Sequence, residues 1–478
     1  MQSKIMNNPK VVDLEKVVIK FAGDSGDGMQ LTGTQFTDTS ALLGNDLATF
    51  PDYPAEIRAP QGTVAGVSGF QIHIGSIDIN TPGDIADVLV AMNPAALKAN
   101  KNFIKKGGSI IINIDSFNQR DFEKAGYKQS PLEDNSFEGY NLIEAPITKL
   151  TRETLKDSKL DGKSIGRAKN MFALGIVYWM FNRPMQQTES FLKTKFKKSP
   201  DLVEANIKVM HAGYNFADTI EALSSSYTVL SAKLPKGTYR NVMGNQAMSW
   251  GFLAAAENAK KELFLGSYPI TPASDILHEL AKHKNLGVKT FQAEDEIAGV
   301  CSAIGASFCG SLAITTTSGP GLALKGEGIG LAIMTELPLV VVDVQRGGPS
   351  TGLPTKTEQS DLMQALYGRN GESPAVVLAS STPANCFDWA YQASKITLEH
   401  NTPVILLSDG YLGNGAEPWK IKSTNDMPKI NPNVAREGDD YLPYARDKKI
   451  LSRKIAIPGT KGLEPVSYTH LRAHETDS

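Results

Sequence analysis

The sequence predicts an α/β protein built from two open, doubly wound sheet domains. Short apolar strands alternate with amphipathic helical stretches along the chain, as in a largely parallel sheet. The alternation restarts after a polar segment near the middle of the sequence. The length of 478 residues also has room for about three domains of ~150 residues each.

The first predicted domain covers residues 1–223. Its expected elements are strands at Lys16–Ala22, Ala86–Ala91 and Ser109–Ile114, and helices over Met29–Leu43, from Gly166 onward, and near Pro200–Ile220. The polar stretch 224–241 contains Ser-rich and Pro-Lys-Gly segments, which are typical of a linker.

The second predicted domain covers residues 242–420 and begins with a helix over Gly244–Ala259. Its expected strands are Leu263–Gly266, Val288–Gln292, Ser311–Thr315, Leu337–Gln345 and Val404–Ser408. Residues 421–465 read as the start of a further, truncated domain. Residues 466–478 resemble a translated sequencing adaptor, so we treat them as a non-native tail, although His470, His474 and Glu475 leave a metal site there as an alternative.

Composition and charge exclude several classes of function. The formal net charge is −2 and no run of Lys and Arg occurs, so we expect no nucleic-acid partner. No signal peptide and no stretch of ~18 apolar residues is visible, so we expect a cytoplasmic protein without a membrane partner.

Cysteine usage points to a partner for redox chemistry. The sequence has 3 cysteines, Cys301, Cys309 and Cys386, without a CxxC pair, which excludes a disulfide framework or a zinc ribbon. A 4Fe–4S cluster is usually held by four thiolates. If electrons leave through a cluster, another polypeptide must hold it, and we expect no metal site on this chain.

A glycine-rich loop at Gly23–Gly28 follows a predicted strand and precedes a predicted helix. Such loops bind phosphates, and Asp52 lies about where a ribose-binding acid belongs. However, the spacing is GxxGxG, and Asp24 and Asp27 would place two carboxylates beside a diphosphate. We therefore favour a tight strand–helix turn over dinucleotide binding by a nucleotide-linked dehydrogenase.

Four polar segments in the second half follow predicted strands. They are YPITP at 268–272, EDE at 294–296, SGPG at 318–321 and RGGP at 346–349. In an open α/β sheet, ligands bind outside the carboxyl ends of the strands, near the point where the winding reverses. Each segment alone is compatible with a plain turn, but together they predict one shared rim.

Two charged residues on this rim carry candidate chemistry. We expect Glu294 to open a helix whose small residues Ala298, Ser302, Gly305 and Cys309 allow close packing, which would desolvate the carboxylate. A carboxyl group in a dry site can share a proton with a ring nitrogen; the alternative is a solvated, acidic helix start. Arg346 suits bidentate binding of a carboxylate, with a surface ion pair as its alternative.

Six ordered segments together resemble the 2-oxoacid:ferredoxin oxidoreductases. YPITP, QAEDEIA at 292–298, TTTSGPG at 315–321 and QRGGPSTGLPT at 345–355 are similar to the family's α subunit. GDSGDGMQLTG at 23–33 and FPDYPAEIRAPQGTVAGVSGFQ at 50–71 are similar to its γ domain, here fused ahead of the α part. Tyr53, Glu56 and Arg58 lie in the γ-like segment without an assigned role.

The resemblance implies a heteromeric enzyme that binds thiamine diphosphate, with a pyrimidine-binding α domain. It implies that Glu294 activates the cofactor's aminopyrimidine ring, that Tyr268, Pro269 and Ile270 line the cofactor, and that Thr271, Arg346 and Thr355 contact the 2-oxoacid. Oxidative decarboxylation of 2-oxoglutarate with coenzyme A would give succinyl-CoA, CO2 and reduced ferredoxin. The alternatives are a pyruvate or branched-chain 2-oxoacid enzyme, or a non-catalytic scaffold subunit.

The sequence also departs from what a complete enzyme of this kind needs. No GDGxxxN-type segment for Mg2+ and the diphosphate is visible, and the cluster cysteines are missing. Both belong to a separate β subunit in the family, so we expect activity only with that partner. The family's α subunit normally continues past residue 460, which puts the handling of coenzyme A in question.

Overall fold

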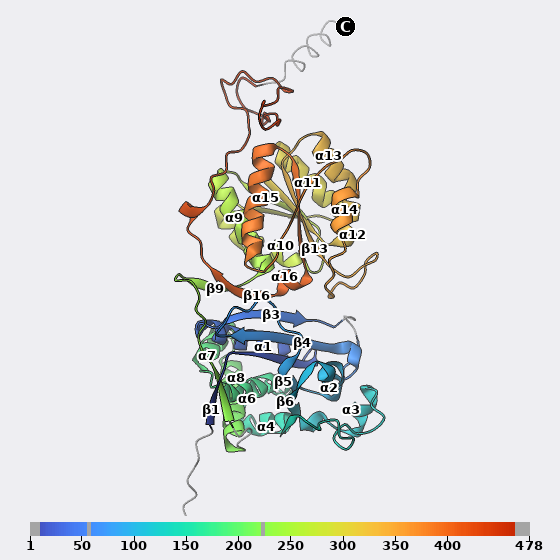
Figure 1. The fold of residues 1–478 in the computed structure, drawn as a ribbon, viewed down its shortest axis with the longest axis vertical. Coiled ribbons are helices and arrows are strands. Elements are labelled where there is room, and N and C mark those ends of the chain that lie inside the picture. The colour runs from blue at the N-terminus through green and yellow to red at the C-terminus, as the bar shows by residue number, and fades with distance from the viewer. Residues whose placement is uncertain (1–9, 55–58, 221–224, 464–478) are drawn as a thin grey trace, which may run out of the picture. The chain divides into compact units, whose positions relative to one another are not determined.

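The computed structural model describes residues 10–54, 59–220 and 225–463, and the chain forms two compact units (Figure 1). Unit 1 comprises residues 1–241 and 415–421, and unit 2 comprises residues 242–414 and 422–478. Glu56, Arg58 and the tail from 466 to 478 lie outside the described residues.

Unit 1 is built on a six-stranded sheet. Its spatial order is β3 (Asp46–Asp52), β4 (Val67–Gly75), β2 (Lys16–Asp24), β5 (Ala86–Ala91), β6 (Ile104–Asn113) and β7 (Asn141–Ala145). The four strands from β2 to β7 are parallel, whereas β4 runs antiparallel to both β2 and β3. The prediction of an α/β sheet is confirmed, with an antiparallel edge that the sequence pattern did not reveal.

Helices cover both faces of this sheet, which buries its alternating apolar side chains. On one face lie α1 (Met29–Leu42), α4 (Ile147–Thr154), α6 (Lys169–Met180), α7 (Gln186–Lys195) and α8 (Pro200–Thr219). On the other face lie α2 (Pro94–Asn100) and α3 (Gln119–Lys124), while α5 (Gly162–Arg167) leads into α6. Short 3₁₀ turns lie at η1 (Val64–Gly66), η2 (Lys101–Phe103) and η3 (Ile114–Ser116).

Two glycines let α6 and α8 pack backbone against backbone. A Cβ atom at Gly175 would lie 2.1 Å from the carbonyl oxygen of Met210, and one at Gly213 would lie 2.1 Å from that of Phe172. Both distances are far inside van der Waals contact. The close approach lets the apolar helix α6, which is buried along nearly its whole length, reach the centre of unit 1.

We predict that Gly213→Ala destabilises unit 1 by about 2–3 kcal/mol, because overpacking of the helix crossing outweighs the gain in helix propensity. Gly166→Ala in α5 is the matched control, since a Cβ atom there meets no neighbour within 4 Å. Denaturant unfolding of both variants measures the difference. Equal stabilities would show that the two helices separate at little cost.

The stretch 224–241, expected as a linker, contributes ordered structure instead. β8 (Ser225–Val229) pairs in parallel with β1 (Lys10–Leu14), and β9 (Tyr239–Met243) pairs with β16 (Ala416–Lys420). Residues 415–421 thus belong with unit 1, which corrects the expected continuous domain from 242 to 420. Short polar strands in two-stranded sheets lack the apolar alternation by which strands are recognised in a sequence.

Unit 2 contains a six-stranded sheet in which every pair is parallel. Its spatial order is β11 (Lys289–Gln292), β10 (Leu263–Ser267), β12 (Leu312–Thr317), β13 (Leu339–Gln345), β15 (Pro403–Asp409) and β14 (Val376–Ala379). The winding runs from β10 to β11 in one direction and from β12 onward in the other. It therefore reverses between β10 and β12, and this is the predicted doubly wound sheet.

Two layers of helices enclose the sheet of unit 2 (Figure 1). One layer holds α11 (Glu296–Phe308), α12 (Gly319–Leu324), α13 (Gly326–Met334) and α14 (Leu362–Tyr367). The other holds α9 (Gly244–Ala259), α10 (Ser274–Leu280), the 3₁₀ turn η4 (Ala281–Leu286) and α15 (Asn385–His400), with α16 (Gly410–Asn414) beside α9.

The segment 422–463 has an irregular backbone and belongs to unit 2. Its Ile455 is part of the same apolar core as residues of α11 and α13. Apart from the 3₁₀ turn η5 (Thr424–Asp426), the segment holds no helix or regular strand among the described residues. In the part of the chain that the structure describes, no helix is both long and apolar enough to cross a membrane.

Candidate functional site

The four polar segments meet at the carboxyl edge of the sheet in unit 2. Ser267 at the end of β10 is in register with Gln292 at the end of β11, and Thr317 of β12 is in register with Asp343 of β13. Because these neighbouring strands are parallel, the loops that follow them leave from the same edge. We call this edge the rim; it is formed by residues 268–272, 293–296, 318–321 and 346–361.

Glu294 stands on the rim with its side chain exposed to solvent. The helix begins two residues later than expected, because Asp295 is the N-cap of α11 and its carboxylate accepts a hydrogen bond of 2.7 Å from the N–H of Ala298. The expectation that small residues of α11 desolvate Glu294 was wrong. Ala298, Ser302, Gly305 and Cys309 lie on the side that is exposed or half-buried.

The buried carboxyl group at this position belongs to Glu296, which is 8% exposed. Its side chain packs on Gly321 of α12, where an added Cβ atom would lie 2.8 Å from Cγ of Glu296 and 1.9 Å from Oγ1 of Thr317. Only glycine fits at residue 321. Glu296 stands in the acidic run EDE at 294–296, and nothing in that run distinguishes the buried glutamate from its exposed neighbours.

A fully buried lysine lies beneath the first turn of α11. Lys325 is 0% exposed, and its ammonium group donates a hydrogen bond of 2.8 Å to the carbonyl oxygen of Glu296. Burial lowers the pKa of Lys325 to about 8, although the attraction of Glu296 and Asp295 opposes the shift. Lys325 stands in an apolar helical stretch, so sequence reasoning did not single it out.

Arg346 is a buried clamp between two rim loops. Its Nη1 donates a 2.7 Å hydrogen bond to the carbonyl oxygen of Thr271, and its Nη2 donates a 2.6 Å bond to that of Thr351. Burial lowers the pKa of Arg346, and the nearby Glu296 opposes this. Nε is buried and has no hydrogen-bond partner among the described residues.

The other candidate residues surround this clamp. Tyr268 is exposed, Pro269 and Ile270 are half-buried, and Thr271 places its side chain at the surface while its carbonyl holds Arg346. Thr355 is half-buried in the same loop as Thr351. The structure thus brings every predicted site residue to the rim of unit 2.

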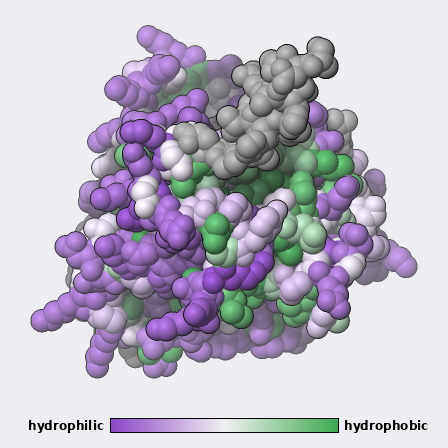
Figure 2. All heavy atoms as spheres, turned by 90° about the horizontal axis from the view of Figure 1, so that it is seen from above, coloured by the Kyte–Doolittle hydropathy of each residue, from purple (hydrophilic) through white to green (hydrophobic). Residues whose placement is uncertain are grey.

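Apolar side chains also reach the surface on and around the rim. Tyr268 is 38% exposed, Phe291 44%, Ile297 51% and Leu353 48%. Figure 2 views the molecule from above, and on that face hydrophobic areas (green) lie between hydrophilic ones (purple). Such surface next to a polar site is typical of a face that a ligand or partner covers.

Family models match both halves of the chain. Residues 255–477 match the family model of the pyruvate flavodoxin/ferredoxin oxidoreductase, thiamine diP-bdg, and residues 18–216 match that of the pyruvate ferredoxin/flavodoxin oxidoreductase. The chain is 56% identical over 454 residues to the 2-oxoglutarate oxidoreductase subunit KorA of Mycobacterium tuberculosis, covering 94% of this chain and 69% of that one.

The chain belongs to the 2-oxoglutarate:ferredoxin oxidoreductase family.

A solved structure supports the same assignment to this family. The 2-oxoglutarate:ferredoxin oxidoreductase of Magnetococcus marinus, solved with 2-oxoglutarate, coenzyme A and succinyl-CoA bound, has a TM-score of 0.79 and 32% identity, covering 94% of this chain and 73% of that one. The 2-oxoglutarate synthase subunit KorA of Archaeoglobus fulgidus is 44% identical over 177 residues, which are 37% of this chain and 50% of that relative.

The residues of the rim fit one end of thiamine diphosphate. Glu294 has an exposed carboxylate and Tyr268 an exposed ring, and their two loops are joined where the N–H of Ala293 donates a 2.9 Å hydrogen bond to the carbonyl oxygen of Ser267. A carboxylate and an aromatic ring suit a flat heteroaromatic ring with a basic nitrogen. No group of three or more His, Cys, Asp or Glu side chains suited to a metal ion occurs among the described residues.

Hydrogen bonds and an ion pair of Asp24 and Asp27 stabilise the Gly23–Gly28 loop. Asp27 accepts a 3.0 Å hydrogen bond from the N–H of Asp24 and forms a 2.8 Å ion pair with Lys169. The carboxylate of Asp24 accepts the N–H of Gly62 at 3.1 Å, and Gly28 adopts a φ of 76°. These contacts support the tight turn and speak against the dinucleotide alternative.

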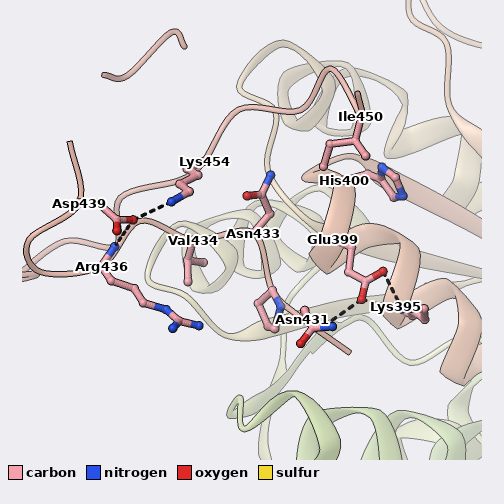
Figure 3. Close-up of a pocket in the computed structure, with 11 residues that line it drawn as sticks. Lys395, Glu399, His400, Asn431, Asn433, Val434, Arg436, Asp439, Ile450 and Lys454 are labelled. Carbon is pink, nitrogen blue, oxygen red and sulfur yellow. Dashed lines mark hydrogen bonds and ion pairs between the residues drawn. The ribbon is translucent and has the colours of Figure 1, made fainter. Parts of the chain in front are cut away.

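An open cavity of about 560 Å³ lies elsewhere in unit 2 (Figure 3). It is lined by the last turn of α15 and by residues 431–454, and α15 ends just before β15 begins. The cavity is therefore at the amino end of the strand, at the opposite edge from the rim. Two of its cations are already paired, Lys395 with Glu399 at 2.6 Å and Lys454 with Asp439 at 2.7 Å.

We predict that Lys325→Met changes how the stability of unit 2 depends on pH. Because the pKa of Lys325 falls from 10.5 to about 8 on folding, the unfolded chain binds this proton more tightly. Wild-type stability should then rise relative to the variant, by up to about 3 kcal/mol, as pH increases from 8 to 10.5. Denaturant unfolding across this range, with the exposed Lys284→Met as control, measures it; parallel curves for wild type and Lys325→Met would contradict the shift.

Proposed function

We propose that this chain supplies the pyrimidine-binding side of a thiamine diphosphate site, and that the assembled enzyme decarboxylates 2-oxoglutarate oxidatively. The observation that supports the proposal is the exposed side chain of Glu294 on the same rim as Arg346, whose guanidinium binds the carbonyl oxygens of Thr271 and Thr351. Thiamine diphosphate, when bound, supplies the nucleophilic carbon and the electron sink that the reaction needs. The acyl group passes to coenzyme A, and the electrons pass to ferredoxin.

Glu294 is assigned to the activation of the cofactor. Its carboxyl group would share a proton with a nitrogen of the aminopyrimidine ring and hold it protonated. A carboxyl group shares such a proton most readily where water is excluded. Within this chain the side chain is exposed, so the desolvation must come from the cofactor and from the subunit that closes over it.

Arg346 is assigned to the carboxylate next to the reacting carbonyl group. The two backbone carbonyls that it binds fix the plane of the guanidinium, so little freedom is lost when a substrate arrives. Nε remains as a buried donor toward a ligand. Thr271 and Thr355 stand on the two loops that Arg346 joins, and their hydroxyl groups are assigned to the 2-oxoacid.

A β subunit is assigned to the remaining parts of the site. It would bring Mg2+, the diphosphate pocket and a 4Fe–4S cluster. In this chain Cys301 and Cys309 are exposed and Cys386 is buried in α15, too few thiols for such a cluster. Exposed Tyr268, Phe291 and Ile297 offer an apolar surface for that subunit to cover.

Co-expression with the β subunit tests the function. The chain is tested in two forms, one as given and one extended to the length of the Mycobacterium tuberculosis relative. Each assay contains thiamine diphosphate, Mg2+, coenzyme A and one of a panel of 2-oxoacids. We expect reduction of viologen or ferredoxin that needs both subunits and favours 2-oxoglutarate over pyruvate and branched-chain 2-oxoacids. A stable complex that reduces neither acceptor with any 2-oxoacid would favour a scaffold subunit instead.

We predict that Glu294→Gln lowers the turnover of the assembled enzyme by about 10²-fold or more, because glutamine cannot hold the ring nitrogen protonated. Association with the β subunit should be unchanged, since the substitution conserves size and removes no contact within unit 2. Turnover and analytical size exclusion measure the two effects. The matched control is Glu327→Gln on the surface of α13; unchanged turnover in Glu294→Gln would remove Glu294 from the mechanism.

A further inference from the structure

Two carboxyl groups face each other beneath the rim. Asp343 lies near the end of β13, on the face that packs under α11, α12 and α14, and its side chain is 0% exposed. Asp361 precedes α14, and its carboxyl group lies against that of Asp343. No N–H or hydroxyl donor among the described residues reaches either carboxyl oxygen of Asp343 or Oδ2 of Asp361.

This arrangement requires a proton between the two groups. An ionised carboxylate buried without a cation or a donor is strongly destabilised, and two carboxylates in contact cannot both be charged. Burial and then the charge of Asp361 raise the pKa of Asp343 well above its usual range. Burial also raises the pKa of Asp361, and Glu358 adds to that shift. The contact with Asp343 acts against the shift of Asp361, and the charges that raise the two pKa values are those of carboxyl groups.

Asp361 occupies a position where its side chain would normally serve its own helix. It is the N-cap of α14, yet it makes no side-chain capping bond. Its Oδ2 instead lies where a Cβ atom at Gly319 would be 2.7 Å away, so the carboxyl group is pressed against the first residue of α12. The carboxyl group of Asp361 therefore contacts Asp343 and the SGPG segment and does not cap α14.

The pair also closes the base of the loop that carries Arg346 and Thr355. Asp343 precedes this loop and Asp361 ends it. Beside the pair, the N–H of Asp361 donates a 3.0 Å hydrogen bond to Oε1 of Gln345, and Nε2 of Gln345 donates a 3.1 Å bond to the carbonyl oxygen of Ser408. The two ends of the loop are therefore tied to each other and to the sheet.

We propose that Asp343 and Asp361 share one proton and act as a positioning pair, which holds the loop from Arg346 to Ser360 closed on the Ser318–Gly321 turn. This rests on the proposed function, because the loop carries residues assigned to the 2-oxoacid. Neither aspartate touches the substrate. When the shared proton is lost at alkaline pH, two negative charges face each other in a buried space, the base of the loop opens, and the 2-oxoacid binds more weakly.

The test uses the complex with the β subunit and follows KM and kcat for the 2-oxoacid against pH. In the wild type, we expect KM to rise roughly tenfold on the alkaline side, as for one lost buried hydrogen bond, with a smaller change in kcat. Asp343→Asn replaces the shared proton by an amide donor, so KM at neutral pH should stay near that of the wild type and the alkaline rise should disappear. Asp343→Leu removes the donor and should raise KM at every pH.

The control is Asp440→Asn, which changes an exposed aspartate in the same unit. An alkaline rise in KM that persists unchanged in Asp343→Asn would overturn the proposal. A readout without activity is the carbonyl stretch of a protonated carboxyl group in the infrared spectrum. We expect this band at neutral pH in the wild type and its loss in both Asp343→Asn and Asp361→Asn.

The infrared measurement also separates the two proposals. If the wild-type complex turns over no 2-oxoacid but shows the protonated carboxyl band, the proposed function fails and the shared proton stands. If turnover is normal and the band is absent, the positioning pair fails and the proposed function stands. Asp361→Asn provides the same comparison should Asp343→Asn not fold.

Discussion

The parallel register of β11, β10, β12 and β13 is the constraint on which the site depends. In this sheet every strand ends at the same edge, so loops that are separated by tens of residues in the sequence leave side by side. Reversing any one strand would move its loop to the opposite edge. Arg346 could then no longer reach the carbonyl oxygen of Thr271, and the hydrogen bond from Ala293 to Ser267, which joins the loops of Glu294 and Tyr268, would be lost.

Beneath this edge, buried charges are each compensated in a different way. Lys325 binds a backbone carbonyl oxygen and is attracted by Glu296, whereas Arg346 uses two carbonyl oxygens and the same glutamate. We propose that Asp343, which has no such partners, is compensated by a proton. A buried charge without a compensating group would strongly destabilise the fold. Each compensating group therefore restricts the positions that the loops above it can take.

Glu294 and Glu296 show how local geometry separates two identical side chains. Asp295 caps the helix between them, so Glu294 remains in the loop and Glu296 enters the first turn of α11. The chain then sends Glu296 inward against Gly321 and leaves Glu294 in solvent. The exposed carboxylate of Glu294 can contact a ligand that binds from solvent. The buried carboxylate of Glu296 instead attracts the buried cations Lys325 and Arg346.

The regular elements could be predicted where their pattern is strong. The helix α9 begins and ends as expected at Gly244 and Ala259, and every expected strand of unit 2 is present within a few residues. β3 and β4 were missed, because Pro51 interrupts the first and both join the sheet as an antiparallel edge. The strands within 224–241 were missed because they are short and polar, so only their pairing partners reveal them.

The sequence by itself determined the α/β class, the two sheets, the four rim segments and the resemblance to the 2-oxoacid:ferredoxin oxidoreductases. These follow from local alternation and from short motifs, which any stretch of chain carries with it. Only the tertiary structure decided the environment of each side chain. Burial of Glu296, Lys325 and Asp343, and exposure of Glu294, depend on which helix packs against which strand, and no spacing along the chain records those contacts.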